Sequence, residues 1–117
     1  MVFLCYPKCS TCRKAQEWLE ERGISYELRL IREDHPDAGE LKAWQMRSGL
    51  PLKRFFNTSG LQYKALNLKD RLPQMSEEEQ LALLASDGML VKRPLLVAED
   101  FVLVGFREGE YEEKLSK

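Results

Sequence analysis

Two cysteines three residues apart, Cys9 and Cys12, are the side chains in this sequence best suited to chemistry. This spacing suits a reversible redox pair in a reducing compartment better than the disulfide framework of a secreted protein. The third cysteine, Cys5, makes the total odd and is expected to be a core residue. The pair therefore predicts thiol redox chemistry, in which one thiolate attacks and the neighbouring thiol resolves the adduct.

The expected position of Cys9 favours its ionised form. The apolar run at residues 2–5 predicts a buried strand, and apolar side chains three or four residues apart predict a helix from about Ser10 to Arg22 that ends at Gly23. Cys9 would then lie beside the unpaired N–H groups and the positive dipole of the helix start, which lower a thiol pKa. Cys12, one turn further on and deeper in the helix, is the predicted resolving thiol.

Three cations flank the pair in the sequence, namely Lys8, Arg13 and Lys14. Their positive charge favours a thiolate at Cys9. Arg13 is in addition a candidate ligand for an anionic substrate.

Two other interpretations of the cysteines are open. Free cysteines are often small buried core residues. A structural zinc site would need four ligands, and the sequence offers only Cys5, Cys9, Cys12 and His35, with no second C-x-x-C motif. His35 lies in a polar turn and is expected at the surface rather than in a catalytic site.

The elements after the first helix predict a βαβ unit and then a helical insertion. A second strand at about residues 25–31 follows so closely that the two strands must be parallel. Within the insertion, at about 33–92, capping-box patterns at Asp37–Glu40 and Ser76–Glu79 begin two helices. No linker composition separates these helices from the rest, so residues 1–117 are expected to form one domain.

The end of the chain predicts a hairpin and a helix. Two apolar stretches, 95–98 and 101–105, are separated by only two acidic residues, which favours antiparallel strands, and a helix is expected at 108–115. The order β-α-β, helical insertion, β-β-α gives a four-stranded mixed sheet with flanking helices. This is the connectivity of a thioredoxin-like fold in the α/β class.

Composition limits the partners that we expect. The 18 basic and 19 acidic residues give a formal charge of -1, so no excess of positive charge points to a direct nucleic-acid partner. The apolar start, Met1–Pro7, is too short for a signal sequence, and no segment approaches the length of a membrane span. We therefore expect a cytoplasmic protein without a membrane association.

Four segments together carry a family resemblance. They are Pro7–Ala15 near the start, Phe55–Gly60 in the middle, and Lys92-Arg93-Pro94 and Gly105-Phe106-Arg107 near the end. With them the chain resembles the ArsC/Spx family of glutaredoxin-like arsenate reductases and their relatives, over essentially its whole length. The resemblance implies the thioredoxin-like fold that the element order also predicts.

The resemblance also implies roles for particular residues. In the arsenate reductases the first cysteine attacks arsenate, arginines bind the oxyanion, and a thiol donor such as glutathione, a glutaredoxin or a thioredoxin completes the reduction without a tightly bound cofactor. Cys9 matches the nucleophile, and Arg93 and Arg107 match two of the arginines, whose guanidinium groups suit an oxyanion. The bond before Pro94 is expected to be cis and to present backbone groups to a substrate beside the active cysteine. Asn57 stands where a third arginine is expected.

The second cysteine keeps two functional hypotheses open. The glutathione-dependent arsenate reductases commonly carry serine at the position of Cys12, whereas the Spx branch carries C-x-x-C as a redox switch. The first hypothesis is an enzyme that reduces a small oxyanion or a disulfide. The second is a redox-sensing regulator that binds the RNA polymerase α subunit.

Overall fold

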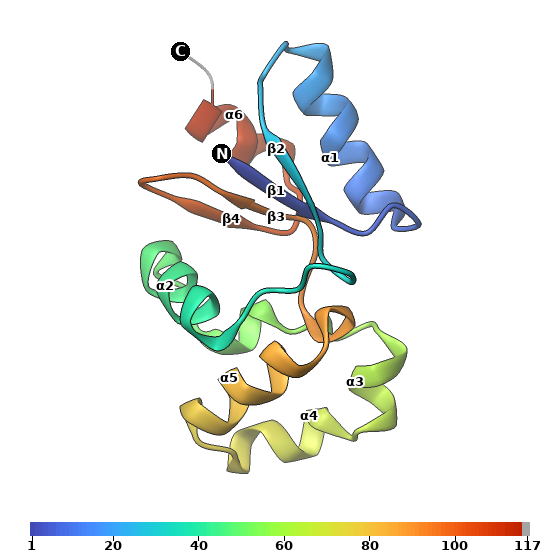
Figure 1. Cartoon of the computed structure of the whole chain (residues 1–117), viewed down its shortest axis with the longest axis vertical. Coiled ribbons are helices and arrows are strands. Elements are labelled where there is room, and N and C mark those ends of the chain that lie inside the picture. The colour runs from blue at the N-terminus through green and yellow to red at the C-terminus, as the bar shows by residue number, and fades with distance from the viewer. Residues whose placement is uncertain (116–117) are drawn as a thin grey trace.

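A four-stranded mixed sheet lies at the centre of the computed structural model, which describes residues 1–115 (Figure 1). The strand order is β2-β1-β3-β4. β1 (Val2–Cys5) pairs in parallel with β2 (Glu27–Leu30) and antiparallel with β3 (Leu95–Val97). β3 in turn pairs antiparallel with β4 (Val102–Val104). The mixed sheet predicted from the order of elements is confirmed.

Each face of the sheet carries its own hydrophobic core, because successive side chains of a strand point to opposite faces. On one face, Phe3 packs with buried residues of α1 (Ser10–Glu21) and α6 (Glu108–Leu115). On the other face, Leu4 packs with residues of the segment that joins β2 to β3. The sheet is therefore covered on both sides, as Figure 1 shows.

The segment between β2 and β3 is the helical insertion predicted from the sequence, and its buried side chains continue the second core. In Figure 1 it occupies the lower half of the molecule. Its elements are α2 (Ala38–Ser48), η1 (Leu52–Phe55), α3 (Leu61–Ala65), α4 (Leu68–Arg71), η2 (Leu72–Gln74), α5 (Glu77–Ser86) and η3 (Gly88–Leu90).

The helix boundaries set by capping residues agree with the sequence. The Glu40 N–H donates to the Asp37 carboxylate at 2.8 Å, and the Glu79 N–H donates to the Ser76 hydroxyl at 3.1 Å. Both capping boxes are complete. Gly23, at φ +65°, follows the end of α1 in the left-handed conformation that glycine adopts without strain.

Two features differ from the prediction. The second strand is four residues long rather than about seven, because β2 is a partly exposed edge strand that pairs only with β1. The short helices α3, α4 and η2 were not predicted, since three to five residues are too few to show a helical period. None of the described helices is long and apolar enough to cross a membrane.

The contact between η3 and the end of β2 gives a test of how the insertion is attached. A Cβ atom added at Gly88 would lie 1.8 Å from the Ile31 carbonyl oxygen, so the backbone must shift in Gly88→Ala. We expect this variant to lose about 1–3 kcal/mol of unfolding free energy in urea denaturation. Gly109→Ala is the matched control, because a Cβ there meets nothing within 4 Å. Equal stabilities of the two variants would contradict the expectation.

Candidate active site

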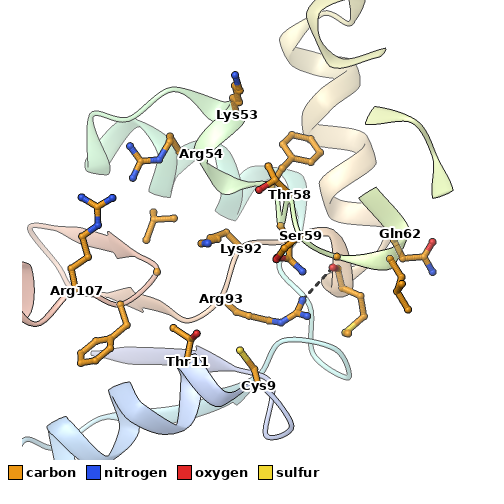
Figure 2. A pocket seen from close by; sticks show the side chains of 18 residues that line it. Cys9, Thr11, Lys53, Arg54, Thr58, Ser59, Gln62, Lys92, Arg93 and Arg107 are labelled. Carbon is orange, nitrogen blue, oxygen red and sulfur yellow. Dashed lines mark hydrogen bonds between the residues drawn. The ribbon is translucent and has the colours of Figure 1, made fainter. Parts of the chain in front are cut away.

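Cys9 is the residue immediately before α1, and the backbone turns there from strand to helix. Its φ and ψ are -87° and 120°, its N–H donates to the Tyr6 carbonyl at 2.9 Å, and its carbonyl accepts from the Arg13 N–H at 3.1 Å. The backbone is thus fixed on both sides of the residue. The half-buried side chain lines a cavity (Figure 2).

The pKa of the Cys9 thiol is lowered, although burial alone raises it. The opposing influences are the N–H groups of Cys12 and Thr11, the Cys12 side chain and the positive charge of Arg93. The Cys9 side chain makes no capping hydrogen bond of standard geometry, so we attribute the effect of the N–H groups to their aligned dipoles at the helix start. Cys9 therefore has the environment of a nucleophilic thiolate.

Cys12 lies on the inner side of α1 and differs from Cys9 in exposure, hydrogen bonding and pKa. It is 1% exposed, and its sulfur accepts a hydrogen bond from the Tyr6 N–H at 3.4 Å. Burial, with a contribution from the charge of Cys9, raises the pKa of Cys12 to about 12. Cys5 is also a buried core residue, with a pKa raised by burial and by Cys9. The expected roles of Cys9 as attacking thiolate and Cys12 as protonated partner fit these environments.

Arg93 supplies the positive charge next to Cys9, and its side chain is held by several contacts. Its Nη1 donates to the Met89 carbonyl at 3.2 Å, and its guanidinium lies 5.2 Å from the centre of the Tyr6 ring. Figure 2 shows the side chain extending from the start of β3 toward Cys9. The following bond, Arg93–Pro94, is cis, as the family resemblance implies.

Asn57 fixes Arg93 from the side of the insertion. It is a buried polar side chain, 8% exposed, in a part of the chain where most buried side chains are apolar. With its amide oxygen turned toward Arg93, it accepts from Nη2 at 3.2 Å and from Nη1 at 3.3 Å. A Cβ atom at Gly60 would lie 2.6 Å from the Asn57 amide nitrogen, so a larger residue at position 60 would displace the Asn57 side chain. The residue found in place of an expected third arginine thus positions another arginine.

The cavity has a volume of about 750 Å³ and lies between the sheet with α1 and the insertion. Apolar side chains form part of its wall, among them Phe56, Met89 and Phe106. All of its charged lining residues are basic: Lys53, Arg54, Lys92, Arg93 and Arg107. Five of the 18 basic residues and none of the 19 acidic ones line it, so the cavity favours an anion although the chain is nearly neutral.

The predicted ligand residues are not all brought together. Arg93 lies beside Cys9, whereas Arg107 lines the cavity at its other end (Figure 2). Arg13, also expected to hold an anion, is exposed on α1 and does not line the cavity, because the helix directs it to solvent. Pro94 is buried and does not line the cavity.

Three lining cations were missed in the sequence: Lys53, Arg54 and Lys92. Lys53 and Arg54 directly precede the Phe55–Gly60 segment of the family resemblance, and Lys92 is the first residue of the Lys92-Arg93-Pro94 segment. Their position in or beside these segments was the sequence signal that could have identified them as cavity residues. Only the fold shows that these residues face one cavity.

The zinc interpretation finds no support in residues 1–115, where no three His, Cys, Asp or Glu side chains come together as metal ligands. His35 is exposed, as expected from its polar turn.

Comparison with known proteins agrees with this geometry. The family model described as the ArsC family matches residues 4–114. The chain belongs to the ArsC family. The uncharacterized protein YusI of Bacillus subtilis is 57% identical over 97% of this chain and 96% of YusI. The regulatory protein MgsR of the same organism is 32% identical over 100% of this chain and 90% of MgsR. The global transcriptional regulator Spx of Enterococcus faecalis is 30% identical over 89% of this chain and 77% of Spx.

Solved structures of ArsC proteins share the fold. An ArsC family related protein from Bacteroides fragilis is 61% identical, with a TM-score of 0.94, over 96% of this chain and 94% of that one. A possible arsenate reductase from Streptococcus mutans is 50% identical, with a TM-score of 0.84, over 91% and 90% of the two chains. The thioredoxin-like fold predicted from the sequence is thereby confirmed.

The lowered pKa of Cys9 can be tested by alkylation with iodoacetamide in Cys12→Ser, which keeps a hydroxyl donor beside it. Because the thiolate is the reactive form, the alkylation rate should reach half of its maximum below the pH typical of a free thiol. In Cys9→Ser, the buried Cys5 and Cys12 should react slowly at neutral pH. Mass spectrometry of samples quenched across a pH series measures the alkylation rates of both variants. A fast, low-pKa thiol in Cys9→Ser would reverse the assigned roles.

The role of Asn57 can be tested through the same titration. In Asn57→Ala the guanidinium of Arg93 loses its acceptor in the insertion, so its charge spends less time near Cys9 and the pKa of Cys9 should rise. Arg93→Gln should raise the pKa of Cys9 as well. Asn57→Ala should change that pKa little when Arg93 is already glutamine. Thr58→Ala, at an exposed neighbour in the cavity wall, is the matched control. An unchanged pKa in Asn57→Ala would rule out this positioning role.

Proposed function

We propose that this protein is a thiol-dependent reductase in which Cys9 is the nucleophile and Cys12 the resolving thiol. The single observation that carries the proposal is the contrast between the two thiols. Cys9 faces the cavity with a lowered pKa, whereas Cys12 is buried one turn further along α1 with a raised pKa. An accessible thiolate beside a protonated reserve thiol is the arrangement that dithiol reduction requires.

The reaction with a disulfide R–S–S–R proceeds in two steps. The Cys9 thiolate attacks one sulfur, the substrate S–S bond breaks, and R–S⁻ leaves as the Cys9 mixed disulfide forms. Cys12 then loses its proton and attacks the Cys9 sulfur, which releases the second R–S⁻ and leaves a Cys9–Cys12 disulfide. Two electrons pass from the protein to the substrate. A thiol donor such as glutathione, a glutaredoxin or a thioredoxin returns them.

Arg93 serves both the thiolate and the substrate in this scheme. Its guanidinium stabilises the ionised sulfur, and its remaining N–H donors are available to an anionic group of the substrate. Arsenate is one candidate, supported by the relatives described as arsenate reductases. Asn57 argues against it as the preferred substrate, because the third oxyanion arginine expected in that family is absent.

A regulatory role is the second candidate, and the relatives named MgsR and Spx favour it. In that role the Cys9–Cys12 pair would sense oxidants and change a contact with the RNA polymerase α subunit, without turnover. The C-x-x-C pair suits both roles, since either uses reversible disulfide formation.

Turnover and binding assays separate the two candidates. The reductase should consume arsenate or a low-molecular-weight disulfide in steady state with glutathione or a thioredoxin system present. Cys9→Ser should lower the rate by on the order of 10³-fold or more, as expected for loss of a nucleophile. Cys12→Ser should accumulate the Cys9 mixed disulfide, seen as an added mass. No turnover with any donor, together with redox-dependent binding of the isolated α subunit, would favour the regulator.

A further inference from the structure

The cavity holds a second group of cations at the end away from Cys9. We call Arg54, Lys92 and Arg107 the distal cluster. Figure 2 shows Arg54 and Arg107 on the side of the cavity opposite Arg93 and Cys9, with the Lys92 amine between the two ends. The three residues come from separate parts of the chain, so the cluster exists only in the folded protein.

Contacts of the same residues place the distal cluster at the end of β4. Arg54 also lines a smaller neighbouring cavity together with Val104 and Glu110, which flank Arg107 in the sequence. A Cβ atom at Gly105 would lie 3.4 Å from the Lys92 Cε, so the Lys92 side chain passes over the residue that begins the Gly105–Arg107 segment. All three cations therefore converge on one short stretch of backbone.

The cations of the distal cluster make no ion pair in the described part of the chain. Within residues 1–115, no carboxylate lies within 4.0 Å of any of the three cations, although the smaller cavity beside Arg54 is also lined by Asp100 and Glu110. Like charges gathered in one hollow repel one another, and a bound anion relieves that repulsion. The cluster is thus suited to hold an anionic group.

The size of the cavity indicates that this anion belongs to the same ligand as the reacting sulfur. A volume of about 750 Å³ lies in the range of sites that hold a whole organic ligand, far above the need of a tetrahedral oxyanion. Apolar wall residues, Phe56, Val104 and Phe106, lie along the cavity and suit the organic part of such a ligand. An oxyanion bound at Arg93 alone would leave most of this space unused.

We propose that the distal cluster is a second anion subsite, which selects thiols and disulfides that carry an anionic group remote from the reacting sulfur. The inference rests on the proposed reductase function and names its substrate class. In the first step the Cys9 thiolate attacks the substrate disulfide, the mixed disulfide forms and an anionic thiolate leaves. The distal cluster holds the retained half while Cys12 releases it.

The first experiment measures the rate at which each of three symmetrical disulfides oxidises the reduced protein. Bis(2-hydroxyethyl) disulfide is neutral and 3,3′-dithiodipropionate carries its carboxylates close to sulfur. Oxidised glutathione carries its glycine and γ-glutamyl carboxylates further from sulfur. We expect oxidised glutathione to react fastest. The double variant Arg54→Gln, Arg107→Gln should react with oxidised glutathione about tenfold more slowly than the wild-type protein. Its rates with the other two disulfides should stay within about twofold of the wild-type rates.

A matched control removes the same charge elsewhere. Arg32 and Lys69 are exposed, lie outside both cavities, and make no ion pair within residues 1–115. Arg32→Gln combined with Lys69→Gln should leave all three rates unchanged. Equal slowing by both double variants would mean that only net charge matters, and it would overturn the subsite.

A second experiment separates this inference from the proposed function. S-Methylglutathione has no reactive sulfur, so its binding requires no redox step, and it should protect Cys9 from iodoacetamide in the wild-type protein. Protection should be lost in the Arg54→Gln, Arg107→Gln variant and with the dimethyl ester of the ligand. Protection without reduction of any disulfide would support the subsite and contradict the reductase. Disulfide reduction with no charge preference and no protection would keep the reductase and overturn the subsite.

Discussion

The ionisation of the half-buried Cys9 sulfur is the constraint around which this site is organised. A thiolate at the start of a helix gains from the backbone dipoles, but a half-buried sulfur also loses contact with water. The Cys12 and Thr11 groups at the helix start offset that loss, and the fixed positive charge of Arg93 adds to their effect. The Met89 carbonyl, the Asn57 amide and the Tyr6 ring all act on Arg93, and they come from three different segments. The folding of the insertion is therefore coupled to the ionisation of a cysteine on the opposite side of the cavity.

The two cysteines show how one short motif produces two different thiols. Position at the first turn leaves Cys9 facing the cavity, whereas the helix turns Cys12 into the core between the sheet, α1 and α6. Burial prevails at Cys12 and raises its pKa, whereas at Cys9 the groups at the helix start and Arg93 together outweigh burial and lower the pKa. A buried neutral thiol is protected from premature oxidation, and it becomes reactive only when an adduct forms next to it.

Much of the fold could be predicted from the sequence because its signals are local. Capping boxes at Asp37 and Ser76, the glycine at position 23 and the apolar runs of β1 and β3 each act within a few residues. The position of Cys9 directly before α1 was likewise predicted. The short helices α3 and α4 were missed, since they depend on packing within the insertion rather than on a period in the sequence. The grouping of Arg54 with Lys92 and Arg107 was missed because residues far apart in the chain meet only in the tertiary structure.

The way the cavity is assembled has a consequence for the diversification of these proteins. Cys9 lies between β1 and α1 at the start of the chain, whereas most of the facing wall comes from the insertion and from the segment after β4. Substitutions in that wall can alter which molecules are accepted while the reaction centre stays intact. The thiol pair and the ligand preference of the cavity can thereby change independently of each other.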